Sequence, residues 1–430
     1  MKAAFFTLGC KVNQYESNEM AIRLKNSGFT LVSPKEEADV YIVNSCTVTA
    51  ESSRKSRQAV RRLKNDHPQS VVVLTGCYPQ AFEEEARQVT QADIVLGTNT
   101  NTQLLDRLQA FLETGVRSVN VAPHVKNASF VGDTVSDFEG HTRAFIKIQD
   151  GCNRRCTYCI IPKSRGFSRS KPLEAVKKEL ADVAENGYKE VVFVGINLSS
   201  YGMDCGLDLA DALLLAEKTP GITRIRLGSL EPDHISDDLI EKLQGLTKFC
   251  PQFHLSLQSG SNAVLKRMNR HYTADEYELL CDKLKKAFPD LTLTTDIIVG
   301  FPGETETEFE ETAAFVRQIG FMKVHIFPFS AREGTPAYTM QDKINNTVKG
   351  ERCTALQTLC EQQRFAFLQA QAGKTFDVLF ETPKNGIQTG YTKQYIPVQV
   401  IHETPLTGRI LPVTVTGAER DACVGKIVFL

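Results

Sequence analysis

The first 115 residues alternate between short apolar runs and longer amphipathic stretches. Apolar runs begin near Ala3, Val40, Val71 and Ile94, and each is followed by a helix-like segment. Uninterrupted apolar runs of this length between helices are typical of parallel strands buried on both faces of a sheet. The pattern therefore predicts a doubly wound α/β domain over residues 1–115.

The alternation stops and then returns. Residues 116–140 have weak periodicity and contain Pro123 and Gly132, so they are predicted to be a linker. Over residues 141–366 six apolar runs again lie between helical stretches. Six strand–helix units favour an incomplete (β/α)6 barrel, in which the chemistry occurs at the carboxyl ends of the strands.

The period of the pattern changes once more after residue 366. Five short β-rich segments follow, the last at 425–430, and turns such as the one at 384–386 separate them. Five short strands in about sixty residues suit a small closed β-barrel. We expect a third domain over residues 367–430.

Composition narrows the class of protein. The net charge of the 430 residues is −1, so nucleic-acid binding must be argued from local patches. No apolar run approaches the ~20 residues of a membrane helix, and the N-terminus does not read as a signal peptide. We therefore expect a cytoplasmic protein with no membrane partner. Its thiols would stay reduced, and its clustered cysteines would serve metals or catalysis.

Three of the twelve cysteines fall within eight residues, as Cys152, Cys156 and Cys159 in a C-x3-C-x2-C pattern. Thiolates so close in sequence can surround one soft metal centre. No fourth cysteine or histidine follows in the next forty residues, so a four-iron cluster held here would keep one iron open for a small molecule. This pattern resembles the radical S-adenosylmethionine enzymes. A zinc ribbon completed from elsewhere, or three bystander thiols, are the alternatives.

Three further cysteines occupy equivalent positions in the first domain. Cys10, Cys46 and Cys77 each follow a predicted strand by two or three residues. Strand-to-helix loops of a parallel sheet open at its carboxyl edge, where such folds bind ligands. The spacing therefore predicts a second three-thiolate site, with small buried cysteines as the alternative.

Four stretches carry a resemblance to a known family: TLGCKVNQYE at 7–16, NSCTV at 44–48, TGCYPQ at 75–80 and GCNRRCTYCIIP at 151–162. They resemble the methylthiotransferase family of radical S-adenosylmethionine enzymes. The LGCKVNQYES opening is most similar to the branch that acts on N6-threonylcarbamoyladenosine in tRNA. The C-terminal segment looks like a TRAM domain, the tRNA-binding module of that family.

The resemblance implies cofactors, partners and a reaction. It implies two 4Fe-4S clusters, one on each cysteine set, and two S-adenosylmethionine molecules per turnover. It implies a radical mechanism that adds a methylthio group to C2 of the modified adenosine, and so makes 2-methylthio-N6-threonylcarbamoyladenosine. The expected partners are tRNA and a one-electron donor such as flavodoxin or ferredoxin.

Polar residues near the predicted strand ends of the barrel are candidates for binding S-adenosylmethionine. A carboxylate suits ribose hydroxyls or an amino group, and glycines let backbone approach the adenine. The candidates are Tyr158 inside the cysteine motif and Gly195, Asn197, Ser229, Glu231, Gln258, Ser259, Gly260 and Asp296.

Two basic stretches and one aromatic stretch are candidates for binding RNA. Residues 54–64 hold six basic side chains and no acidic one, with Arg54, Arg57 and Arg61 on one helix face. Arg165 belongs to a second basic stretch, around the cysteine motif. Tyr391, Lys393 and Tyr395 of the C-terminal domain offer stacking and phosphate contacts.

Other functions stay open from the sequence. A methylthiotransferase acting on isopentenyladenosine tRNA or on a ribosomal-protein aspartate would share the six cysteines. A zinc-dependent RNA-binding protein without catalysis would bind a colourless metal instead. Iron and sulfide analysis separates the last alternative from the others, because two 4Fe-4S clusters require about eight irons per chain.

Overall fold

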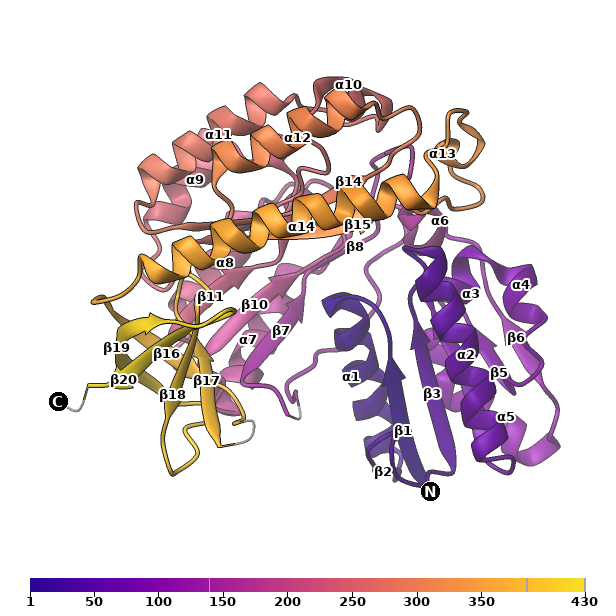
Figure 1. Ribbon diagram of the computed structural model, residues 1–430. Coiled ribbons are helices and arrows are strands. Elements are labelled where there is room, and N and C mark those ends of the chain that lie inside the picture. Colours follow the sequence, from indigo (N-terminus) through magenta and orange to yellow (C-terminus); the bar gives the residue numbers. More distant parts are fainter. Residues whose placement is uncertain (139, 384–385, 429–430) are drawn as a thin grey trace.

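The computed structural model describes residues 1–138, 140–383 and 386–428, which form three consecutive units (Figure 1). Parts of two predicted features lie outside these residues, namely the turn at 384–386 and the end of the last strand at 425–430. Among the described helices, none combines the length and apolar character needed to cross a membrane.

The first unit is the predicted doubly wound domain. Its parallel sheet has the strand order β2-β1-β3-β4-β5-β6. Separate apolar cores lie on the two faces, one under α1 and α5 and the other under α2, α3 and α4. The elements are β1 (Lys2–Thr7), α1 (Lys11–Asn26), β2 (Thr30–Leu31), β3 (Val40–Ser45), α2 (Ala50–Asp66), β4 (Val71–Gly76), α3 (Cys77–Ala81), α4 (Glu83–Arg87), β5 (Ile94–Leu96), η1 (Asn101–Gln103), α5 (Leu104–Thr114) and β6 (Ser118–Asn120).

Two strands of this sheet were not predicted. β2 and β6 are the edge strands, with two and three residues, and neither contains a fully buried residue. Because their side chains are half exposed, they show no continuous apolar run. β6 lies within residues 116–140, so the sheet extends past the predicted boundary at 115, and the linker prediction is wrong for residues 118–120.

The strand order of the first sheet reverses its direction between β1 and β3. The chain leaves β1 towards β2 on one side and leaves β3 towards β4 on the other. Such a reversal opens a crevice at the carboxyl edge of the sheet, where these folds bind ligands. Cys10 and Cys46 follow the two strands that flank it.

The second unit is the predicted incomplete barrel. Its parallel strands run in chain order as two hydrogen-bonded groups, β7-β10-β11 and β12-β13-β14-β15, and the two groups meet at Gly228 between β11 and β12. The strands are β7 (Arg143–Lys147), β10 (Glu190–Val194), β11 (Arg224–Leu227), β12 (Ser229–Leu230), β13 (Gln252–Leu255), β14 (Thr292–Val299) and β15 (Lys323–Pro328). With β11 and β12 counted as one interrupted strand, they give the six predicted units.

Helices cover the outside of this barrel (Figure 1). The best-formed ones begin at side-chain caps, as Thr273 and Thr305 show by accepting hydrogen bonds from the backbone three residues ahead. The elements between the strands are α6 (Ile161–Arg165), α7 (Leu173–Glu185), η2 (Leu198–Ser200), α8 (Leu209–Lys218), η3 (Pro232–His234), α9 (Asp237–Gln244), α10 (Asn262–Arg267), α11 (Ala274–Ala287), α12 (Glu306–Ile319), α13 (Pro336–Thr339) and α14 (Asn346–Gln369).

The third unit is the predicted small barrel, and it closes with the strand order β16-β17-β18-β20-β19. The long helix α14 leads into it across the outside of β15 (Figure 1). Its strands are β16 (Thr375–Phe380), β17 (Ile387–Tyr391), β18 (Pro397–Ile401), β19 (Ile410–Ala418) and β20 (Cys423–Ile427).

The third unit docks on the amino-terminal end of the barrel strands. Arg224 donates to the backbone carbonyls of Tyr391 and Asp377, at 3.0 and 2.7 Å. The hydroxyl of Thr292, the first residue of β14, donates to the carbonyl of Gln394 at 2.5 Å. The small barrel therefore closes the end opposite to the carboxyl ends of the strands.

Candidate functional site

The loop of the first cysteine set starts just after β7. A short antiparallel ribbon of β8 (Gln149–Asp150) and β9 (Arg169–Ser170) joins the two ends of the loop. Gly151 has a φ of 72°, and a Cβ there would stand 2.0 Å from the carbonyl oxygen of Phe167. Only glycine fits this turn. The backbone N–H of Cys152 then donates to the Gly166 carbonyl at 3.0 Å, which closes the loop.

Polar groups surround the three sulfurs. Arg270 donates from Nη1 to the Cys156 sulfur at 3.2 Å, and the Arg154 backbone N–H donates to the Cys152 sulfur at 3.4 Å. Burial raises the pKa of the Cys159 thiol to about 12 and also raises that of Cys152. Burial has the same effect on the pKa of the core thiol of Cys281, so these thiols would need a positive charge beside them to ionise.

The second cysteine set lies at the carboxyl edge of the first sheet. Thr7, Asn44 and Thr75 are aligned on the adjacent strands β1, β3 and β4, so the cysteines that follow emerge side by side. A Cβ added at Gly9 would stand 3.0 Å from the Cys46 Cβ. The structure therefore brings these three predicted residues to one place.

Local contacts fix the second set. Asn13 Nδ2 donates to Asn44 Oδ1 at 3.2 Å, and Asn44 Nδ2 donates to the Asn13 carbonyl at 2.9 Å, which holds α1 against β3. Gly76, before Cys77, has a φ of 97°, and a Cβ there would meet Asn44 Oδ1 at 2.4 Å. The turn into α3 therefore requires glycine.

Arg165 links the two cysteine sets. It ends α6, only six residues after Cys159, and its Nε donates to the Cys77 sulfur at 3.2 Å. Burial raises the pKa of the Cys77 thiol to about 12, and the Arg165 guanidinium opposes this rise. One short helix thus contacts a ligand candidate of each set.

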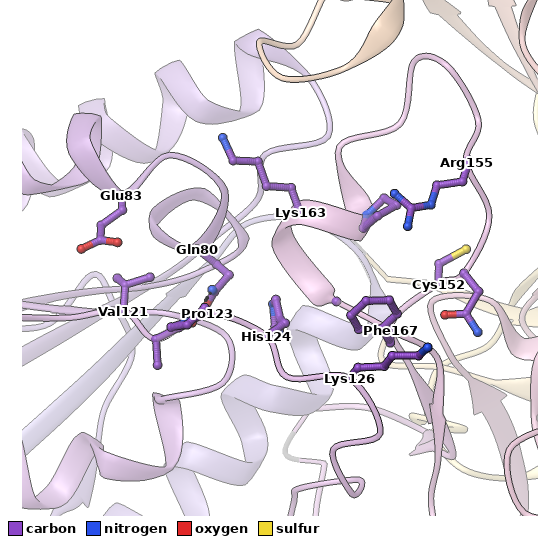
Figure 2. Close-up of a pocket in the computed structure, with 14 residues that line it drawn as sticks. Gln80, Glu83, Val121, Pro123, His124, Lys126, Cys152, Arg155, Lys163 and Phe167 are labelled. Atoms are coloured by element: carbon purple, nitrogen blue, oxygen red, sulfur yellow. Dashed lines mark hydrogen bonds between the residues drawn. The ribbon is translucent and has the colours of Figure 1, made fainter.

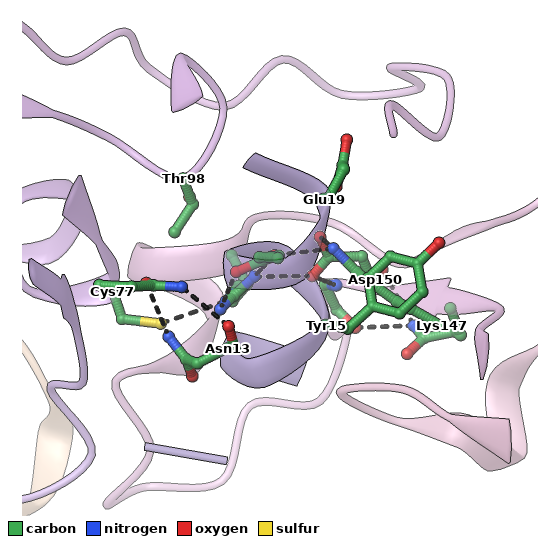
Figure 3. Close-up of polar contacts among 12 residues, drawn as sticks. Asn13, Tyr15, Glu19, Cys77, Thr98, Lys147 and Asp150 are labelled. Atoms are coloured by element: carbon green, nitrogen blue, oxygen red, sulfur yellow. Dashed lines mark hydrogen bonds and ion pairs between the residues drawn. The ribbon is translucent and has the colours of Figure 1, made fainter. Parts of the chain in front are cut away.

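A buried ionic network continues from Arg165 (Figure 3). Arg165 pairs with both carboxylate oxygens of Glu16, and Lys147 bridges Glu16 and Asp150 at 2.8 and 2.7 Å. Asp150 in turn accepts the backbone N–H of Gly151 at 2.8 Å. The network therefore connects Cys77 to the first turn of the other cysteine loop through side chains that are almost completely buried.

A second contact holds the carboxyl edge of the sheet against the barrel mouth. Arg332, in the loop after β15, donates from Nη2 to the hydroxyls of Thr47 and Ser53 at 2.9 and 2.8 Å. The Ala50 backbone N–H donates to the Ser330 hydroxyl at 3.0 Å. The two cysteine sets consequently lie at carboxyl edges that face each other around α6 (Figure 1).

The sulfur spacing distinguishes between kinds of metal centre. A single tetrahedral zinc ion holds its sulfur ligands about 3.8 Å apart, given a Zn–S distance of about 2.3 Å. Within the described residues, neither cysteine set brings three sulfurs within 4.8 Å of one another. Binding of one tetrahedral ion would therefore require the sulfurs of either set to move closer together.

Several predicted pocket residues lie beside the first cysteine set. Asn197 places Nδ2 3.8 Å from the Cys152 sulfur, and its buried Oδ1 has no hydrogen-bond partner among the described residues. Glu231 pairs with Arg270, the residue that contacts Cys156. An unsatisfied acceptor and a carboxylate beside the sulfurs fit a ligand that offers amino and hydroxyl donors.

Of the other pocket candidates, three lie in the segment 258–260 after β13, and the remaining four are on other segments. Ser259 and Gly260 pack on α12, because the Ser259 hydroxyl lies 3.1 Å from that of Thr312 and a Cβ on Gly260 would stand 2.7 Å from the Phe315 Cβ. Their neighbour Gln258 has a φ of 74°, a strained conformation typical of functional sites. The roles predicted for the rest of the set stay predictions, and these residues are Tyr158, Gly195, Ser229 and Asp296.

The arginines predicted to bind RNA through helix α2 differ in their contacts. Arg54 is half exposed and pairs with Glu51. Arg57 pairs with Glu85 at 3.2 Å and also lies over the Tyr78 ring. Arg61 is exposed and makes no ion pair within the described residues. Their contact with RNA stays a prediction.

The predicted RNA contact of Arg165 is wrong in this structure. Arg165 is fully buried, and its guanidinium is engaged by Glu16 and Cys77. The basic stretch around the cysteine motif suggested an exposed rim. Its sequence does not reveal that Glu16, far away in the chain, would neutralise this charge.

The aromatic stretch of the third unit is also turned inward. Tyr391 and Tyr395 stack at 4.5 Å between ring centroids, and the guanidinium of Arg143 lies 4.8 and 5.0 Å from the two rings. Lys393 donates to the Thr247 carbonyl at 3.3 Å. These residues hold the small barrel against the larger one. All three stay partly exposed, and their contact with RNA stays a prediction.

A cavity of about 580 Å³ lies next to Cys152 (Figure 2). It is lined by Gln80 of α3, Glu83 of α4, residues 121–124, Lys126 and the cysteine loop. Lys126, Arg155 and Lys163 border it with Phe167, whose side chain is 38% exposed. The cavity therefore combines positive charge with an accessible aromatic ring, which suits an anionic ligand with a planar base.

Sequence reasoning missed two arginines of the site. Arg270 and Arg332 come from loops after α10 and β15 and reach Cys156 and the loop of Cys46, respectively. Neither lies near a cysteine in sequence. Two signals were present: Arg270 lies in the short basic run KRMNRH at 266–271, and both arginines follow predicted strand–helix units, where barrel loops carry chemistry.

Two protein-family models match this chain, one over most of the first unit and one within the second unit. Residues 146–316 match the Radical SAM superfamily, and residues 2–97 match the uncharacterized protein family UPF0004. Among solved structures, the radical S-adenosylmethionine methyltransferase TsrM from Kitasatospora setae aligns with a TM-score of 0.58 at 12% identity, covering 90% of this chain and 80% of that one. At this low identity, the likeness shows that the two chains share a fold.

Full-length relatives are much more similar in sequence. Threonylcarbamoyladenosine tRNA methylthiotransferase MtaB of Bacillus subtilis (strain 168) is 38% identical, covering 99% of this chain and 96% of that protein. The protein of the same name from Thermotoga maritima is 39% identical, over 91% and 89% of the two chains. The tRNA-2-methylthio-N(6)-dimethylallyladenosine synthase of Alkaliphilus oremlandii is 34% identical, over 98% and 92%. The chain belongs to the methylthiotransferase family of radical S-adenosylmethionine enzymes.

Proposed function

We propose that this protein transfers a methylthio group to C2 of N6-threonylcarbamoyladenosine beside the anticodon of tRNA. The branch choice is supported by relatives named for threonylcarbamoyladenosine at 36–39% identity, against 32–36% for those named for dimethylallyladenosine. The same reaction on isopentenyladenosine tRNA is the second candidate, because the two ranges meet.

The observation that supports the reaction most strongly is the pairing of two cysteine sets across α6. We propose that Cys152, Cys156 and Cys159 hold the cluster expected of the superfamily, and that Cys10, Cys46 and Cys77 hold a second one. With bound S-adenosylmethionine, the first cluster supplies the one-electron chemistry that an unactivated carbon requires. A flavodoxin or a ferredoxin would provide the electron.

The protein's own residues have positioning tasks in this proposal. Asn197 offers its unpaired Oδ1 to a donor of S-adenosylmethionine, and Glu231, held by Arg270, offers a carboxylate. The hydrogen bonds from Arg270 to Cys156 and from Arg165 to Cys77 draw charge from ligand sulfurs, which raises reduction potentials. Holding both centres on one network fixes the distance that the transferred group must cross.

We propose that the tRNA approaches along the cavity of Figure 2. Lys126, Arg155 and Lys163 suit phosphate oxygens, and Phe167 suits stacking with an unpaired base. Anticodon-loop bases are single-stranded, so they can leave their stack at small cost.

Mass spectrometry of tRNA nucleosides tests the proposal. Cells lacking this gene should lose 2-methylthio-N6-threonylcarbamoyladenosine and keep the unthiolated nucleoside. The intact gene should restore it, and the matched cysteine variant Cys205→Ala, in an exposed loop, should do so equally. Loss of the isopentenyl product would favour the second candidate. Unchanged tRNA would point to a ribosomal-protein aspartate, and a zinc-containing, iron-free protein would overturn the reaction class.

A further inference from the structure

Three adjacent strands of the larger barrel bring metal-binding side chains together away from both cysteine sets. His254 lies on β13, Asp296 on β14 and His325 on β15. One ligand atom from each lies within 4.8 Å of the other two, and no other such group of His, Cys, Asp and Glu occurs in the part of the chain that the structure describes.

Strand register explains this convergence. His254 is aligned with Thr294, and Asp296 with His325, on parallel strands. Side chains alternate along a strand, and Phe253, Leu255 and Ile297 join the core under the outer helices. The His and Asp side chains therefore point into the barrel, where aligned residues share a face.

The contacts within the group are those of an oriented ligand set. His254 Nε2 lies 3.2 Å from Asp296 Oδ2, and His254 Nδ1 lies 3.0 Å from the Thr294 hydroxyl. Gln252 Nε2 donates to that hydroxyl at 3.2 Å. Metal-bound histidines are commonly oriented by such a hydrogen bond at their second nitrogen.

His325 completes the set without a competing partner. Its ring centroid lies 5.9 Å from that of His254, and its side chain makes no hydrogen bond within the described residues. The side chains of His254 and Asp296 are 14% and 30% exposed, so the group is reachable from the barrel interior.

We propose that His254, Asp296 and His325 form a third metal site, which binds one divalent transition-metal ion such as Zn²⁺ or Fe²⁺. Two imidazoles and one carboxylate suit these ions, whereas Mg²⁺ and Ca²⁺ prefer all-oxygen sites and Cu⁺ prefers sulfur. Three protein ligands leave open positions for an oxygen donor inside the barrel. Asp296 then acts here as a metal ligand and not as a residue of the S-adenosylmethionine pocket.

The site does not depend on which substrate the enzyme uses. It lies between the barrel mouth and the amino-terminal end that the small barrel closes, because Asp296 is central in β14 while Thr292 contacts Gln394. The site is therefore held by the middle of the barrel strands, away from the strand ends where the cysteine loop begins.

Zinc binding to the iron-loaded full-length protein tests the site. The reconstituted protein is dialysed anaerobically against limiting Zn²⁺, and zinc is counted by mass spectrometry. X-ray absorption at the zinc edge then reads the ligands without interference from iron. We expect about one zinc per chain with N/O ligands at about 2.0–2.1 Å and no sulfur at about 2.3 Å. Asp296→Asn and His325→Ala should each weaken binding at least tenfold.

Two controls keep the result interpretable. His402→Ala changes a histidine of the small barrel whose ring bonds, among the described residues, only to Thr404, and this variant should bind zinc as the unchanged protein does. Iron content and circular dichroism confirm folding of Asp296→Asn, which keeps the side-chain shape. Absence of zinc, zinc held by sulfur, or zinc held equally by all variants would overturn the proposal and would identify His254 and Asp296 as a simple hydrogen-bonded pair.

Discussion

The two cysteine sets reach similar arrangements by opposite routes. Cys152, Cys156 and Cys159 lie on one loop, and the ribbon of β8 and β9 closes that loop by itself. Cys10, Cys46 and Cys77 come from three strands, and only the register of the first sheet brings them together. The first set depends on local sequence, whereas the second depends on the whole domain and on its docking through Arg165.

This difference should make each of the two proposed clusters separately removable. In the iron-reconstituted protein, Cys156→Ala should retain about four of about eight irons, and Cys77→Ala should do the same. Only Cys77→Ala should still cleave S-adenosylmethionine under reducing conditions, because the first set stays intact. Both variants should make no methylthio product. Iron analysis and chromatography of cleavage products provide the measurements.

The matched control for these variants is Cys360→Ala, on α14 away from both sets. It should keep full iron and full activity. If Cys77→Ala lost all iron, the two sets would form one cooperative centre, and the comparison between a local and an assembled site would fail.

Disrupting the buried ionic network should destabilise the protein and should affect the second cysteine set before the first. Arg165→Met removes the charge that Glu16 and Asp150 share, and leaving buried charges unpaired costs about 3–5 kcal/mol. We expect urea denaturation to show this loss, together with iron loss from the Cys10, Cys46 and Cys77 set first. Arg155→Met, at an exposed position, should change the free energy of unfolding by less than about 0.5 kcal/mol.

The direction in which the free energy of unfolding changes with pH follows from Asp150. Burial opposes its charge, but Lys147 and Arg165 outweigh burial and hold its pKa below the ordinary value. Stability from such a carboxylate is present above the unfolded pKa of about 4 and is lost as the pH falls through the folded pKa. The difference between Arg165→Met and the unchanged protein should therefore be constant from about pH 6 to 8. A difference that vanished within this range would contradict the network.

A smaller effect is expected where the third unit docks. Tyr395→Ala removes the stack on Tyr391 and the hydrogen bond that Arg143 donates to its hydroxyl at 3.0 Å. We expect a loss of about 2 kcal/mol in the stability of this contact. Limited proteolysis near the end of α14 should accelerate, while both clusters keep their iron. A drop in tRNA affinity with unchanged proteolysis would instead restore an RNA-stacking role.

The sequence predicted most of the architecture because buried strands and helices have strong periodic patterns. β3 and β4 are fully buried and were predicted, whereas β2 and β6 are half exposed and were not. The dispersed cysteines were found through fold register and the family resemblance. Periodicity thus predicts where chain segments lie but says little about exposed edges.

Side-chain partners were much harder to predict. The charge of Arg165 suggested RNA, but the structure pairs it with Glu16, which is 149 residues away in sequence. Tyr391 and Tyr395 suggested stacking on a base, but they stack on each other. Local composition shows where charged and aromatic side chains lie in the sequence. It does not show which distant groups these side chains contact in the fold.

The smallest expected effect concerns helix α2, which depends on neither cysteine set. Arg61→Ala removes an exposed charge that makes no ion pair in the described residues, whereas Arg54 is already paired with Glu51. If α2 contacts phosphate, Arg61→Ala should weaken tRNA binding and lower the slope of log affinity against log salt by about 1. Arg54→Ala should change the slope less, because Glu51 already competes for that charge. Filter binding at several salt concentrations measures both slopes, and unfolding should be unaffected. Equal slopes for both variants and the unchanged protein would place the tRNA away from α2, leaving the cavity beside Cys152 as its path.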